Sequence, residues 1–162
     1  NNKNIIPVSE QVNEQVEKNV RIVPTRSIPE GFSSLLAFDP KADAETNAET
    51  MTALASMVVT GEVTQAVRDS DTGSGAVKEG DWIGLDRSGV VVSSDSLLTT
   101  TQELLSSLIA DSHEIVTVIS GDGSSEEITK AIKEWIAVEA PQIEIEVHQG
   151  GQPLYPYYFG IE

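Results

Sequence analysis

The chain contains no cysteine among its 162 residues. Disulfide bridges, thiolate metal ligands and a cysteine nucleophile are therefore excluded. A reducing environment suits this composition, and we expect a cytoplasmic protein. Long apolar runs are also missing, since no stretch approaches the roughly 20 residues that a membrane-spanning helix needs. We therefore expect no membrane insertion.

Basic residues are scarce. Ten Lys and Arg stand against 26 Asp and Glu, which gives a formal net charge of -16 at pH 7. Nucleic acids and anionic membrane surfaces bind clustered Lys and Arg and repel a chain of this charge. We expect no nucleic acid among its partners. The acidity fits either simple solubility or steering toward a partner with a basic face.

The motifs of common catalytic and metal sites are absent too. There is no G-x-S-x-G turn and no G-x-G-x-x-G or G-x-x-x-x-G-K-[ST] phosphate loop. The Gly-rich segment 121–125 precedes a helix, but nearby acids would repel a phosphate, and helix capping explains its Ser residues. We expect His113 to be exposed in a polar loop. His148 lacks a second His, a Cys or a paired acid nearby, and the acids flanking the turn 69–75 lack EF-hand spacing. We predict no catalytic residue and no metal site.

Apolar residues recur at two spacings. Helical spacing predicts helices over residues 8–16, 28–38, 44–58, 97–109 and 125–138. At the start of the second helix, Ser27 and Glu30 form a capping pair and Pro29 fits the first turn. Short β-branched or alternating runs predict strands over residues 20–23, 62–68, 81–84, 90–92, 115–119, 143–148 and 157–161.

This alternation of helices and strands predicts the α/β class. We expect a mixed sheet with helices on both faces and a β-hairpin-rich insert around residues 62–93. The run 115–119 is apolar on both faces, so we expect a central strand that is covered on both sides. The length favours one domain, with possible lobes at residues 1–60 and 61–162.

The segment 148–157 (HQGGQPLYPY) closes the chain with two adjacent glycines and two prolines. It lies between the last two predicted strands, as either a ligand-holding loop or a rigid corner. His148 is a candidate base or ligand because His titrates near neutral pH. Tyr155 and Tyr157 are candidates for packing or for contact with a partner.

A second candidate site begins at the strand-to-helix turn Pro24–Thr25–Arg26. Such turns often hold ligands in α/β proteins. Arg26 and Arg68 suit a carboxylate or a phosphate, because a guanidinium group can pair with two oxygens. Together with Thr25 and His148, they are predicted to line a small-ligand pocket.

Seven blocks of the sequence together resemble the C-terminal domain that fatty acid kinases carry in their catalytic chain, in the DAK2-domain or dihydroxyacetone-kinase-like family. The blocks are residues 2–6 (NKNII), 23–31 (VPTRSIPEG), 36–40 (LAFDP), 60–64 (TGEVT), 66–69 (AVRD), 78–85 (KEGDWIGL) and 147–157 (VHQGGQPLYPY). They occur in order over nearly the whole chain. The resemblance also implies a DegV-like fold, although the His-x-Gly-Pro-Gly of the DegV ending is replaced here by HQGGQ.

The resemblance implies the function of a longer protein. In that family an N-terminal DhaL-like domain binds ATP and magnesium, and the kinase phosphorylates a fatty acid that a separate DegV-like protein carries, for phospholipid synthesis. The kinase Asp cluster lies in the N-terminal domain and matches no position here. Because the chain starts without Met, we expect a C-terminal fragment of a longer, ATP-dependent kinase. We expect the fragment itself to hold no cofactor.

Two functions follow as hypotheses. The first is a non-catalytic docking domain that recruits the acyl-loaded DegV-like fatty-acid-binding protein to the N-terminal kinase domain of the same chain. The alternative is a ligand-binding domain with a residual pocket for a fatty acid or a phosphorylated metabolite.

Overall fold

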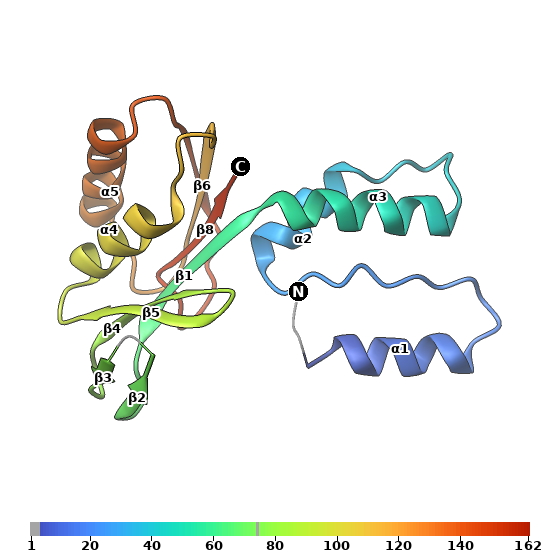
Figure 1. The fold of residues 1–162 in the computed structure, drawn as a ribbon, viewed down its shortest axis with the longest axis horizontal. Helices are drawn as coiled ribbons and strands as arrows, with labels where there is room; N and C mark the ends of the chain where they lie inside the picture. The colour runs from blue at the N-terminus through green and yellow to red at the C-terminus, as the bar shows by residue number, and fades with distance from the viewer. Residues whose placement is uncertain (1–3, 74) are drawn as a thin grey trace. The chain divides into compact units, whose positions relative to one another are not determined.

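The computed structural model describes residues 4–73 and 75–162. The first two positions of the block 2–6 and one position of the turn 69–75 lie outside the described residues. Contacts divide the chain into two compact units, Asn1–Val58 and Val59–Glu162 (Figure 1). We call them the helical unit and the sheet unit and describe each by itself.

The helical unit contains α1 (Ile6–Gln15), α2 (Ile28–Leu36) and α3 (Ala44–Met57), and α2 packs against α3. These helices confirm the periodicity in the sequence. The predicted strand at 20–23 is wrong, because residues 16–27 form neither helix nor strand. A β-branched run needs a neighbouring strand to pair with, and the described part of this unit contains none.

Side-chain caps begin two of these helices. Ser27 Oγ accepts a hydrogen bond from the Glu30 N–H at 3.2 Å, as the sequence predicts for α2. The Glu30 carboxylate reaches one residue further back and accepts from the Arg26 N–H at 2.6 Å. Asp43 caps α3, and the backbone hydrogen bond from Thr46, followed by one from its side chain, lowers the pKa of Asp43.

The sheet unit holds a six-stranded mixed sheet in the order β5-β4-β1-β8-β6-β7. Its strands are β1 (Val59–Gln65), β4 (Trp82–Asp86), β5 (Gly89–Ser94), β6 (Ile115–Ser120), β7 (Glu144–Gln149) and β8 (Tyr157–Ile161); β2 (Ser70–Thr72) and β3 (Gly75–Val77) form a separate hairpin. The β6–β7 pair is parallel and the other pairs are antiparallel. The α/β class, the mixed sheet and the hairpin-rich insert are thereby confirmed.

Both helices of the sheet unit, α4 (Leu97–Leu108) and α5 (Glu126–Glu139), cover the same sheet face (Figure 1). A Cβ on Gly61 would lie 2.8 Å from Leu108 of α4, so Gly61 faces α4. Val63 shares that face of β1 and pairs with Tyr157, whose hydroxyl lies 2.8 Å from Thr129 of α5. Within this unit, both helices therefore lie on one face of the sheet, where the sequence predicts helices on both faces.

The core lies between this sheet face and the two helices. Its fully buried side chains include Leu104, Val116, Val118, Ile132 and Phe159. The position of β6 inside the sheet confirms the predicted central strand, but the helices of this unit cover only one of its faces. On the opposite face, β1 and β7 carry polar side chains at every second residue, whereas β4 and β6 also place apolar residues there, including Ile83 and Ile119.

The closing segment 150–156 is not a hairpin turn, because β6 lies between β7 and β8. Gln152 fastens the segment by donating from Nε2 to the backbone oxygens of Ile119 at 3.0 Å and Tyr155 at 3.1 Å. A Cβ on Gly121 would lie 2.5 Å from Gln152, so only glycine fits there. Leu154 adopts φ 69°, which is uncommon for a residue other than glycine. These contacts favour a rigid corner.

Candidate partner-binding surfaces

The four residues predicted to line a ligand pocket are divided between the two units. Thr25 is buried in the helical unit and Arg26 is exposed there. In the sheet unit, Arg68 is exposed in the loop after β1, and His148 is exposed near the end of β7. His148 Nε2 lies 3.4 Å from Glu146 Oε2. No hydrogen bond or ion pair between described residues joins Arg68 to His148.

The tyrosines of the closing segment have different environments. Tyr157 is fully buried, its ring stacks 5.9 Å from that of Phe159, and it therefore packs in the core rather than contacting a partner. Tyr155 is half-buried and stacks on Tyr158 at 5.0 Å. Tyr158 was not among the predicted site residues, although alternation along β8 places it on the face opposite Tyr157 and Phe159.

The Tyr155–Tyr158 pair lies in an electronegative environment. Burial, followed by the charge of Glu62, raises the pKa of Tyr155. Burial, then Glu62, then Tyr155 raise the pKa of Tyr158 to about 12. Both phenols therefore stay protonated at neutral pH and remain hydrogen-bond donors on the sheet face that α4 and α5 leave uncovered.

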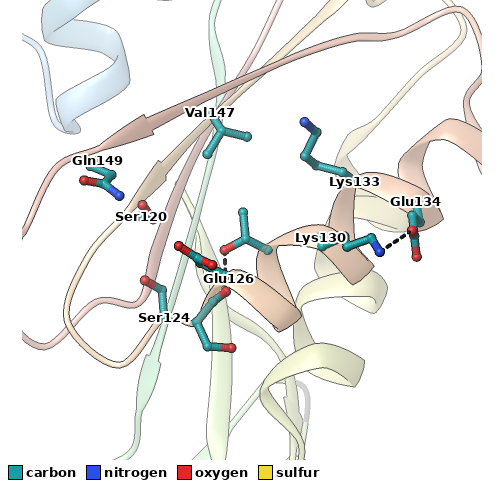
Figure 2. Close-up of a pocket in the computed structure, with 10 residues that line it drawn as sticks. Ser120, Ser124, Glu126, Lys130, Lys133, Glu134, Val147 and Gln149 are labelled. Atoms are coloured by element: carbon teal, nitrogen blue, oxygen red, sulfur yellow. Dashed lines mark hydrogen bonds and ion pairs between the residues drawn. The ribbon is translucent and has the colours of Figure 1, made fainter.

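A groove of about 540 Å³ runs between α5 and β7 (Figure 2). Ser and Thr hydroxyls, Lys130, Lys133 and two glutamates line it, and Val147 is its one apolar lining residue. Lys130 Nζ lies 3.6 Å from Glu134 Oε1. None of the six residues predicted as site residues lines this groove. The groove forms where the β6–α5–β7 crossover brings α5 beside β7, and no local motif in the sequence indicates that contact.

The helical unit exposes apolar side chains along two helix faces. Ile5, Val8, Val12 and Val16 follow helical spacing at α1 and are 39–59% exposed; we call them the α1 stripe. Ile28, Phe32, Leu35 and Leu36 on α2 are 36–82% exposed; we call them the α2 stripe. A helix in a self-contained domain turns such a stripe toward a core.

The interior of the helical unit is unusually polar. Its buried residues include Thr25, Ser27, Glu30, Ser33, Ser34 and Asn47, whereas the buried apolar side chains among its described residues are Pro29, Ala55 and Val58. Asn47 forms two hydrogen bonds with the backbone of Asp39, each 2.8 Å long. Its Oδ1 accepts from the Asp39 N–H, and its Nδ2 donates to the Asp39 carbonyl. This unit is therefore held by caps and hydrogen bonds more than by apolar burial.

The described residues lack two features that often mark a metal or ligand site. They contain no cluster of three or more His, Asp or Glu that could hold a metal ion. Within the same residues, every buried side-chain nitrogen or oxygen has a hydrogen-bond partner, so no orphaned polar atom points to a missing ligand. No helix in the described part of the chain has the length and apolar character of a membrane span.

The fold places the chain among α/β proteins built on a mixed sheet. The FakA-like C-terminal family, made up of C-terminal domains of proteins like the A chain of fatty acid kinase, matches residues 1–162, and the chain belongs to that family. The resemblance seen in the sequence blocks is thereby confirmed.

Staphylococcal proteins are similar over the whole chain. The chain is 39% identical over 162 residues to the "Uncharacterized protein SH1689" of Staphylococcus haemolyticus (strain JCSC1435). It is 40% identical over 162 residues to the "Uncharacterized protein SAR1202" of Staphylococcus aureus (strain MRSA252). Each match covers 100% of this chain but 29% and 30% of the respective relative, so the chain spans under a third of their length.

Proposed function

We propose that this chain is a non-catalytic docking domain of a cytoplasmic fatty acid kinase. It brings an acyl-loaded DegV-like fatty-acid-binding protein to the DhaL-like kinase domain of the parent chain, which binds ATP and magnesium. The family assignment supports the kinase context. The chain itself supplies binding surfaces rather than reacting groups.

The α1 and α2 stripes are the observation that most supports a role in binding other proteins or domains. Burying apolar surface stabilises a complex by about 25 cal/mol per Å² before the costs of association. Leu36 at 82% and Phe32 at 60% exposure leave much of that stabilisation unused in the chain alone. Contiguous exposed apolar residues commonly mark protein–protein interfaces.

The two units suit two kinds of interface. Permanent interfaces are more apolar, and transient ones are more polar and charged. We assign the stripes of the helical unit to a lasting contact with the kinase domain. We assign the sheet unit, with 18 acidic against five basic residues, to a transient contact with a carrier that presents a basic face.

Capture of the carrier tests this function. The acyl-loaded carrier is immobilised and exposed to the whole kinase or to the kinase lacking these 162 residues. The proposal expects strong capture of the whole kinase and little capture of the shortened protein, at unchanged ATP binding by the kinase domain. Equal capture of both proteins would contradict it.

The α5–β7 groove favours a second candidate, the binding of a small phosphorylated metabolite. Lys130, Lys133 and the hydroxyls could contact a phosphate, although Glu126 and Glu134 oppose it. Mass spectrometry of the purified chain and thermal-shift measurements with phosphorylated metabolites and fatty acids test this candidate. A reproducibly absent ligand and no shift exclude it.

A further inference from the structure

The outer edge of the sheet at β7 has no partner strand among the described residues. The strand is six residues long, and five of its residues are exposed. An edge of this kind presents backbone N–H and C=O groups that can pair with another extended chain. The β7 edge therefore supplies the backbone groups of a binding site for a further strand.

Alternation along β7 determines which backbone groups face outward. The N–H of Glu144 donates to the Glu114 carbonyl at 2.7 Å, and that of Gly150 donates to the Ser120 carbonyl at 2.8 Å. In a parallel ladder, every second residue turns its N–H and C=O toward the same neighbour. Even-numbered residues therefore bond inward to β6, and Ile145, Val147 and Gln149 direct their backbone groups outward.

The groove lies beside this edge. Val147 and Gln149 point their side chains to the side on which α5 presents Lys130 and Lys133 (Figure 2). A strand paired with β7 would therefore place alternate side chains in the groove, between β7 and α5. Peptide-binding domains that add a strand to a sheet edge use such pockets for specificity.

The β7 side chains on the face away from α5 indicate the charge of the strand that binds there. Glu144 and Glu146 are exposed on the face away from α5. A second copy of this chain pairing edge to edge would bring these carboxylates against their equivalents, which is unfavourable. A strand with Lys or Arg at alternate positions would instead place cations beside them.

We propose that β7 receives an extended segment of the fatty-acid-binding carrier by strand addition. The segment has basic side chains over Glu144 and Glu146 and small or polar side chains in the α5–β7 groove. This inference rests on the proposed function, because it names where the carrier binds the docking domain.

Residue-resolved amide exchange tests the geometry. The 15N-labelled chain is measured by NMR with and without saturating acyl-loaded carrier. We expect the amides of Ile145, Val147 and Gln149 to exchange fast in the free chain and slowly in the complex, while those of Glu146 and His148 are slow in both. A bound carrier that leaves the odd-numbered amides fast would overturn strand addition.

Two variants of Val147 distinguish the contribution of its backbone N–H to carrier binding from that of its side chain. Val147→Pro removes an outward N–H without breaking a bond to β6, so it should weaken carrier binding about tenfold or more. Val147→Ala keeps that N–H and should change the affinity about threefold or less. Equal affinities for Val147→Pro and the unaltered chain would refute the inference.

Charge reversal provides an independent measurement. Glu144→Lys/Glu146→Lys should weaken binding more than Glu103→Lys/Glu139→Lys, which makes the same charge change at exposed sites on α4 and α5. Equal losses would count against the assigned site but not against docking. Absence of any binding by the unaltered chain would instead reject the proposed function. Amide shifts around Thr129 and Lys133 with inorganic phosphate, but none at β7 with carrier, would assign the groove to a small anion.

Discussion

The helical unit and the sheet unit place their apolar side chains in opposite ways. Among the described residues, ten of the exposed large apolar side chains lie in the helical unit and four in the sheet unit. The sheet unit buries Leu104, Ile132, Tyr157 and Phe159 completely. The sheet unit therefore has a closed apolar core, whereas the helical unit exposes apolar side chains that a core would bury.

Truncating one aromatic residue in each unit tests this difference in burial with the largest expected effect on stability. Phe159→Ala should lower the free energy of unfolding by about 3–5 kcal/mol, because it removes a fully buried ring. Phe32→Ala should change it by about 0.5 kcal/mol or less, because Phe32 is already 60% exposed. Urea unfolding followed by circular dichroism measures both. Similar losses would show that Phe32 contributes to a core.

The closing segment tests how rigidly the sheet unit is built. Gln152→Ala removes two hydrogen bonds to backbone carbonyls, those of Ile119 and Tyr155, and should cost about 1–3 kcal/mol of stability. Gln142→Ala, at an exposed position, serves as the control and should cost about 0.5 kcal/mol or less. If the two variants unfold alike, the segment is not fastened through Gln152.

The affinity contributed by the α2 stripe tests the same comparison through exposed side chains of the helical unit. Leu36→Ser should weaken association with a separately produced kinase domain about tenfold, which corresponds to about 1.4 kcal/mol. Val138→Ser on α5 is a matched control, since Val138 is 76% exposed and Leu36 is 82% exposed. Isothermal titration calorimetry measures both affinities. Equal weakening would mean that exposure alone, rather than the stripe, determines binding.

The smallest expected effect concerns the tyrosine pair of the sheet unit. Burial and Glu62 raise the pKa of Tyr158 from 10.0 to about 12. The unfolded chain therefore ionises first, and this contribution to stability is lost as the pH rises from about 10 to about 12. Glu62→Gln should lower the Tyr158 pKa without restoring the ordinary value, because burial remains. Ultraviolet titration of tyrosinate, with Tyr155→Phe for assignment, measures it; no downward change would exclude the charge of Glu62 as a cause.

The sequence predicts those features that depend on local chemistry. Helical spacing and the Ser27 cap locate α2, and the apolar run of β6 predicts its interior position in the sheet. The strand predicted at 20–23 is wrong because pairing, which local sequence does not encode, decides whether a β-branched run becomes a strand.

The candidate sites were harder to predict. The groove requires α5 and β7 to meet through a crossover, and no local motif signals that contact. The stripes were visible as periodic apolar residues, but periodicity does not say whether a stripe faces a core or solvent. The choice between packing and partner contact for Tyr157 stayed open for a similar reason, since its burial depends on its pairing with Val63 and on Thr129 of α5.

Native-state hydrogen exchange on the 162-residue chain and on the whole kinase tests the central claim most directly. We predict that amides of α1 and α2 exchange rapidly in the isolated chain and become protected in the whole kinase, while amides of β6 and β8 are equally protected in both. Equal and strong protection of α1 and α2 in the isolated chain would contradict the claim that their apolar stripes are an interface.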